Sequence, residues 1–154
     1  MVNANPVEVV EREVRIAARP ETIFGFFTDP VRMLRWKGIE AELDPRPGGT
    51  YRVQINAQSI ARGQYVVVEP HRRLVFTWGW EGEGQPVPPG SSTVEVTLTP
   101  DGDETILRLT HRGLPAELRD VHGHGWDHFL SRLATAAAGG DPGPDPMASA
   151  ENMA

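Results

Sequence analysis

The 154-residue sequence contains no cysteine. This absence excludes a disulfide framework, a thiolate metal site and a cysteine nucleophile. The chain also lacks any apolar run near the roughly 18 to 20 residues that a membrane-spanning helix needs. Its N-terminus has neither the basic n-region nor the apolar h-region of a secretory signal. We therefore expect a cytoplasmic protein with no membrane partner.

Basic residues are in the minority, with 15 Lys and Arg against 21 Asp and Glu and a formal net charge of −6. General nucleic-acid binding requires a basic face that displaces counterions, so this class of function is excluded. The sequence also lacks a Gly-x-Ser-x-Gly elbow, a Gly-x-Gly-x-x-Gly fingerprint and a Gly-Lys-Ser/Thr loop. Serine-hydrolase and nucleotide chemistry therefore have no support.

The C-terminal stretch differs in composition from the rest of the chain. Residues 139–154 are rich in Gly, Pro and small side chains and contain three acidic residues and no basic one. Alternate prolines prevent a helix and weaken a strand. We predict a flexible N-terminus over 1–6, one domain over 7–138 and a disordered acidic tail over 139–154. Half of the net charge then belongs to the tail, which weakens the charge argument, but the body also shows no basic stripe.

Hydrophobic periodicity predicts the elements of the domain. Alternation over residues 7–17 predicts a half-buried strand. Pro20 stands at a typical first helical position, and the spacing of Ile23, Phe26 and Phe27 predicts a short helix that ends before Pro30, where another turn begins. From residue 39 to 110 short alternating runs are separated by turn residues. Connections this short indicate antiparallel strands joined by hairpins.

The last element is predicted to be a long amphipathic helix that begins near Pro115 and ends at Gly139. Gly123 and Gly125 lie inside it, which weakens the helix or marks close contact with the sheet. An antiparallel sheet with one apolar face requires a cover, and this helix is the largest one in the pattern. We predict an α+β fold in which a curved antiparallel sheet of about six to seven strands wraps around the C-terminal helix, with two short helices after the first strand.

A series of short motifs resembles the SRPBCC (START/birch-allergen-like) superfamily, closest to the branch of activators of the 90-kDa heat-shock chaperone ATPase, the AHSA-type domains. The match covers roughly residues 9–135. The motifs that carry it are Arg19-Pro20-Glu21-Thr22-Ile23-Phe24, Thr28-Asp29-Pro30, Trp36, Arg46-Pro47-Gly48-Gly49, Gly63-Gln64-Tyr65, Glu69-Pro70, Arg73-Leu74-Val75-Phe76-Thr77-Trp78, Thr110-His111, Gly113-Leu114, His122 and Gly125-Trp126. The resemblance implies a helix-grip fold with a hydrophobic cavity between the sheet and the C-terminal helix. It also suggests a chaperone partner and a role in stress response.

Aromatic residues are the first candidates for the lining of such a cavity, since they combine large apolar surfaces with indole N–H donors. Plain core packing is the alternative role for each of them. Trp80 shares a strand face with Trp78 but adjoins the Gly-rich loop, so we expect it at the rim. The candidate ligand-binding residues are Phe26, Trp36, Tyr51, Phe76, Trp78, Trp126 and Phe129.

Candidate polar groups for the cavity are Arg108, His111 and His122. The histidine side chain is the group that changes charge near neutral pH. Asp120, His124 and His128 recur at four-residue spacing on the terminal helix, which can place metal ligands on one face. A solvated helix face explains these three residues better, so no metal and no cofactor are expected. No pair of carboxylates forms a convincing catalytic dyad, and no catalytic residue is assigned.

These features favour binding of a small hydrophobic or amphipathic ligand between the sheet and the C-terminal helix. Two alternatives stay open. One is a cyclase or aromatase-like enzyme that uses the same cavity with Arg108, Tyr51, His111 or His122 as its polar group. The other is a co-chaperone-type interaction module. An exposed edge strand would also allow a homodimer.

Overall fold

The computed structural model describes residues 9–149 and confirms the predicted α+β architecture. Seven strands form one antiparallel sheet in the order β1-β7-β6-β5-β4-β3-β2. The strands are β1 (Val9–Ile16), β2 (Glu40–Leu43), β3 (Thr50–Gln54), β4 (Ile60–Glu69), β5 (Arg73–Trp78), β6 (Ser92–Asp101) and β7 (Glu104–Arg112). The helices are α1 (Pro20–Thr28), α2 (Pro30–Met33) and α3 (Arg119–Ala137), with 3₁₀ turns η2 (Ala116–Leu118) and η3 (Pro146–Ser149).

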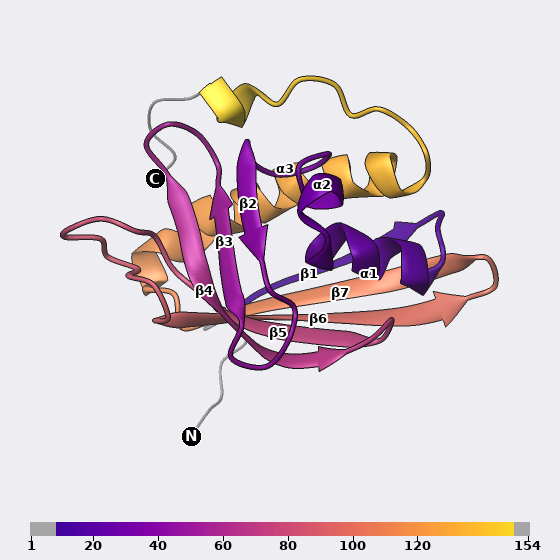
Figure 1. Cartoon of the computed structure of the whole chain (residues 1–154), viewed down its shortest axis with the longest axis horizontal. Helices are drawn as coiled ribbons and strands as arrows, with labels where there is room; N and C mark the ends of the chain where they lie inside the picture. The colour runs from indigo at the N-terminus through magenta and orange to yellow at the C-terminus, as the bar shows by residue number, and fades with distance from the viewer. Residues whose placement is uncertain (1–8, 150–154) are drawn as a thin grey trace.

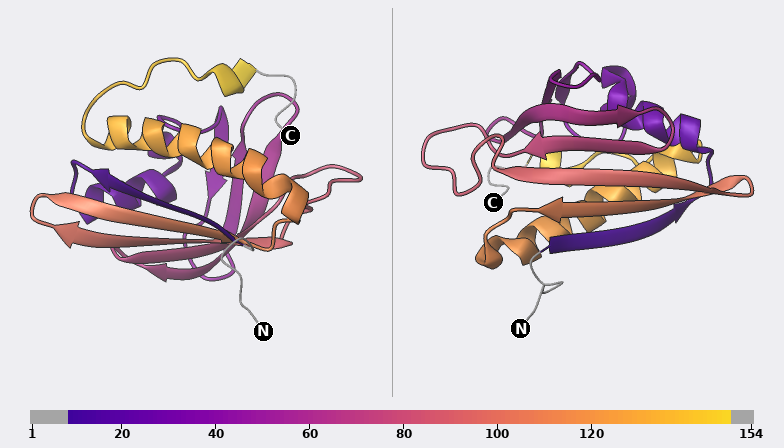
Figure 2. Two further views of the ribbon diagram at one scale, coloured as in Figure 1. Left: turned by 180° about the vertical axis from the view of Figure 1, so that it is seen from behind. Right: turned by 90° about the horizontal axis from the view of Figure 1, so that it is seen from below.

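All three α-helices lie on one face of the sheet (Figure 1). Seen from below, the strands stand in front of the helices, and α3 runs across the concave side (Figure 2). This is the helix-grip arrangement, because the sheet curves around the long C-terminal helix. Within residues 9–149, no helix has both the length and the apolar composition required to cross a bilayer.

The curvature of the sheet comes from β4. Its first half pairs with β3 and its second half with β5, and the register shifts between Tyr65 and Val67. Gly63 lies next to this shift, and a Cβ at that position would overlap the carbonyl oxygen of Thr77. A bulge with a glycine beside it lets the strand bend, so β3 and β2 fold over toward the helices.

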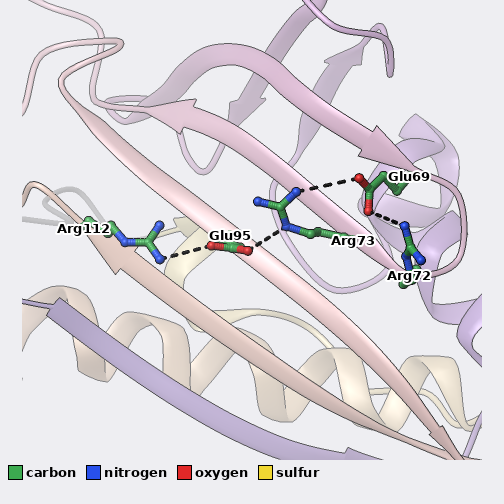
Figure 3. Close-up of polar contacts among 5 residues, drawn as sticks. All are labelled: Glu69, Arg72, Arg73, Glu95 and Arg112. Atoms are coloured by element: carbon green, nitrogen blue, oxygen red, sulfur yellow. Dashed lines mark hydrogen bonds and ion pairs between the residues drawn. The ribbon is translucent and has the colours of Figure 1, made fainter.

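Strand alternation divides the sheet into an apolar inner face and a charged outer face. On β5, Leu74, Phe76 and Trp78 are buried, as the sequence pattern predicts. The outer face carries a row of ion pairs that links β4, β5, β6 and β7 (Figure 3). At its centre, Glu95 accepts from Arg73 Nε at 2.8 Å and from Arg112 at 3.1 Å.

The chain after α3 turns back over that helix toward the β3–β4 loop (Figure 2). Asn56 Nδ2 donates to the carbonyl oxygen of Met147 at 3.1 Å, and His128 Nε2 lies 2.7 Å from Asp145 Oδ1. Residues 139–149 therefore have defined contacts in this structure. The domain boundaries and the disordered tail stay predictions, and residues 1–8 and 150–154 lie outside the described part.

Candidate functional site

A pocket opens between α3 and the C-terminal ends of β3 and β5. Lys37, which follows α2 by four residues, also lines it. The volume of the pocket is about 40 Å³. On the first turn of α3, Val121 is exposed and His122 is half-buried, and these two residues mark the side that faces solvent. The lining residues are Lys37, Ile55, Trp78, Trp80, Val121, His122, Gly125, Trp126 and Phe129.

The size of the pocket limits what it holds in this conformation. A single water needs roughly 10–15 Å³ of such volume, so about 40 Å³ accommodates a few waters or one small functional group. A larger ligand must leave its body in the mouth or displace side chains. The walls are mainly aromatic, which is the usual chemistry of a small-molecule site.

Behind the pocket, Trp126 and Ser92 hold His111 in one tautomer. Trp126 Nε1 donates to His111 Nδ1 at 3.0 Å, and an indole N–H can only donate. His111 Nε2 therefore carries the proton and donates to Ser92 Oγ at 2.8 Å, and Ser92 Oγ donates to the carbonyl oxygen of Trp78 at 2.8 Å. Burial lowers the pKa of His111 to about 3, assisted by the nearby His122 and Lys37, so the ring is neutral.

His122 is held in a similar way at the pocket wall. Trp80 Nε1 donates to His122 Nε2 at 3.1 Å, so the other ring nitrogen, Nδ1, donates to the carbonyl oxygen of Leu118 at 2.9 Å. Burial lowers the pKa of His122, although the contact with Leu118 opposes the shift. Both nitrogens of this ring are engaged, and the ring is neutral at pH 7.

Lys37 is the cation of the pocket. Its Nζ lies 4.2 Å from the ring centroid of Trp126 and 5.3 Å from that of Phe129. The residue is 4% exposed, and burial lowers the pKa of its amine to about 7. Such a shift reflects the penalty for a charge in a low-dielectric site, here offset in part by cation–π contacts.

Three of the seven aromatic candidates, Trp78, Trp126 and Phe129, line this pocket together with Trp80. The other four pack in the core beside it. Tyr51 stacks on Phe76 at 4.2 Å between centroids, and Trp36 Nε1 donates to the carbonyl oxygen of Phe26 at 2.9 Å. The roles of all seven in ligand contact stay predictions.

The three polar candidates also differ in their position relative to the pocket. His122 lines the pocket, and His111 lies behind its wall in contact with Trp126. Arg108 is exposed on the outer face of β7, where it pairs with Glu13 at 2.8 Å. Its side chain is therefore on the far side of the sheet from the pocket.

The remaining histidines on α3, His124 and His128, have different surroundings. His124 is exposed, and His128 contacts Asp145. Asp120 is exposed as well. Among residues 9–149 no group of three or more His, Cys, Asp or Glu side chains is arranged to hold a metal ion.

Sequence reasoning missed Lys37, Ile55, Val121 and Gly125 as lining residues. Ile55 and Val121 have no signal beyond their apolar character. Lys37 did have a signal in the sequence. It is the only lysine of the chain, and all other Lys or Arg positions hold arginine. A residue type used once, next to the motif tryptophan Trp36, was a reason to examine that position.

Comparison with known proteins identifies the family. The sequence model for "Activator of Hsp90 ATPase homolog 1-like protein" (AHSA1) matches residues 17–138. An AHSA1-like protein from Rhizobium etli, solved by NMR, is 48% identical, with a TM-score of 0.72 over 94% of this chain and 90% of that one. CalU16 from Micromonospora echinospora is 32% identical, with a TM-score of 0.71 over 90% and 77% of the two chains.

A curated relative extends the comparison to fungi. An uncharacterized protein of Schizosaccharomyces pombe is 27% identical over 119 residues. The match covers 73% of this chain and 32% of the yeast protein, so the chain spans about a third of that relative's length. The family match extends over more than half of the sequence and agrees with the helix-grip fold, and the chain therefore belongs to the AHSA1 family.

Proposed function

We propose that this protein binds a small amphipathic molecule in the pocket between the sheet and α3. The observation that carries the proposal is the composition of the wall: three of the four tryptophans of the chain, together with Phe129, surround one opening. Side chains that served only core packing would be expected to fill this space. Gly125 contributes to it, because a Cβ at this position would meet no atom within 4 Å.

Intrinsic fluorescence tests the proposal directly. Trp78, Trp80 and Trp126 line the pocket, whereas Trp36 lies outside the lining, with its Nε1 bonded to Phe26. We expect saturable quenching or a spectral shift on titration with a panel of lipids, polyketides and small aromatic compounds. The response should persist in the Trp36→Phe variant. A folded protein that gives no saturable response to any compound would refute the proposal.

A cyclase-like reaction in the same pocket is the second candidate, and its polar group would be His122. The hydrogen bonds of that ring weigh against it, since Trp80 occupies Nε2 and Leu118 occupies Nδ1. A general base needs a free lone pair within reach of the substrate. We therefore favour binding without catalysis.

A chaperone partner is a further proposal that rests on the description of the family. Co-purification of the full chain with a 90-kDa heat-shock chaperone is the relevant measurement. A cytoplasmic location and a role in stress response stay proposals of the same kind.

A further inference from the structure

The single lysine of the chain lies in the pocket and not on the surface. Arginine supplies every other Lys or Arg position in the sequence. An arginine keeps its charge at any accessible pH, whereas a lysine can lose its proton when it is buried. Among the Lys and Arg side chains, the one that can lose its proton is therefore the one that is buried in an aromatic pocket.

Lys37 has no counter-ion among residues 9–149. Its Nζ makes no hydrogen bond or ion pair with these residues, and its neighbours are the rings of Trp126, Phe129 and Trp36. The titratable groups near enough to interact with it are His111 on β7 and His122 on α3, and both rings are neutral. A buried ammonium without a partner is unfavourable, so this position gains most from a negatively charged neighbour.

A second donor in the wall also lacks a partner. Trp78 Nε1 is buried and makes no hydrogen bond within the described part of the chain. Every other polar group at this site is occupied: Trp80 and Trp126 donate to histidines, and both nitrogens of His122 are engaged. Among residues 9–149, the side chains that line the pocket therefore offer donors and no free acceptor.

We propose that the pocket receives the carboxylate of an amphipathic ligand, with Lys37 as its counter-ion and the aromatic wall around its apolar body. This inference deepens the proposed function and rests on it. A carboxylate has only acceptor atoms, so it complements a wall that presents only donors. Its three heavy atoms match a volume of about 40 Å³, and the body of the ligand then lies in the mouth beside Val121.

Calorimetric titration with two nearly isosteric compounds, 2-naphthoate and 2-naphthamide, tests the charge preference. At pH 6.5 we expect the naphthoate to bind at least tenfold more tightly. Lys37→Met keeps an unbranched side chain one atom shorter, removes the charge, and should remove this preference. Arg35→Met is the matched control, since Arg35 is exposed, stacks over Phe26 and contributes the same charge without lining the pocket. Trp78→Phe should weaken naphthoate binding and retain a preference for it.

The pH dependence provides a second readout. Between pH 6.5 and 9 Lys37 loses its proton, so naphthoate affinity should fall while naphthamide affinity stays constant. Equal affinity for both compounds in the wild type and in Lys37→Met would overturn the carboxylate inference and leave the binding function intact. Failure of both compounds to bind a folded wild-type protein would instead overturn the proposed function.

Discussion

At the scale of single residues, two tryptophan–histidine pairs determine the chemistry of the pocket wall. Each indole donates to one ring nitrogen, so each histidine must donate through the other nitrogen to a hydroxyl or carbonyl oxygen. Protonation of His111 would place a proton opposite the N–H of Trp126 and break that bond. The two tryptophan–histidine pairs therefore stay neutral beside the titratable amine of Lys37.

Ser92 completes the His111 pair, and its removal has a defined effect. In Ser92→Ala, the Nε2 proton of His111 and the carbonyl oxygen of Trp78 both lose a buried partner. Each unsatisfied buried group costs roughly 1–3 kcal/mol, and two groups lose their partner, so the free energy of unfolding should fall by at least this amount. Urea denaturation checks this value. Ser91→Ala, at the adjacent exposed position, should leave the midpoint unchanged.

Lys37 makes stability depend on pH in a direction opposite to that of a surface lysine. Its pKa is about 7 in the fold and 10.5 in the unfolded chain. Between these values the unfolded state holds a proton that the folded state lacks, so the free energy of unfolding rises with pH. Below pH 7 the full burial penalty acts.

We expect Lys37→Met to be more stable than the wild type at pH 6, with the difference smaller by roughly 2–3 kcal/mol at pH 9. Urea denaturation at both pH values is the measurement. A constant difference between the two proteins would mean that the amine keeps its ordinary pKa in the fold.

At the scale of elements, the first turns of α3 combine an intrinsically weak helix with the pocket mouth. Gly123 and Gly125 both lower helix propensity, yet they face different surroundings. A Cβ at Gly123 would approach the flexible guanidinium of Arg12, whereas a Cβ at Gly125 would meet no atom within 4 Å. The helix is therefore intrinsically less stable at Gly125, next to the opening of the pocket.

Alanine substitutions at these two positions should distinguish the effect on protein stability from the effect on ligand access to the pocket. Gly125→Ala should raise stability by about 1 kcal/mol and weaken ligand binding, because the new methyl group narrows the pocket. Gly123→Ala serves as the control, and we expect no change in its affinity. Thermal unfolding and calorimetric titration measure the two effects. Unchanged affinity in Gly125→Ala would show that the mouth lies elsewhere.

The elements were predictable because each strand and helix has its own periodicity. The apolar face of β5 and the end of α1 before Pro30 follow from local spacing and proline chemistry. The pocket was less predictable, since it depends on the angle at which α3 crosses the sheet. Tyr51 and Phe76 have the same apolar character as Trp78 but pack against one another, and no local pattern distinguishes the two outcomes.

At the scale of the whole molecule, the segment after α3 is held by a few polar contacts and by Met147, which packs against the edge of the core. Asp145 Oδ1 accepts from the backbone of Met147 at 2.9 Å and lies 2.7 Å from His128 Nε2. The body of the domain depends little on these contacts, because the buried core residues all lie between Val10 and Ala137. The segment should therefore detach without global unfolding.

Asp145→Ala should speed proteolytic cleavage within residues 139–149 and shift the unfolding temperature only slightly. Limited proteolysis with mass spectrometry follows the cleavage. Asp141→Ala, which removes only a local turn contact to Gly143, should show wild-type cleavage. Equal cleavage of the Asp145 variant and the wild type would contradict this view of the segment.

The uniqueness of Lys37 gives the molecule a built-in chemical reporter. An acylating reagent finds one side-chain amine in the entire sequence, and that amine lies beneath the rings of Trp126 and Phe129. Because its low pKa leaves much of it unprotonated near neutral pH, access of the reagent limits the reaction more than nucleophilicity does. The acylation kinetics of this one site therefore record how readily a small molecule reaches the pocket, in the free protein and in any complex it forms.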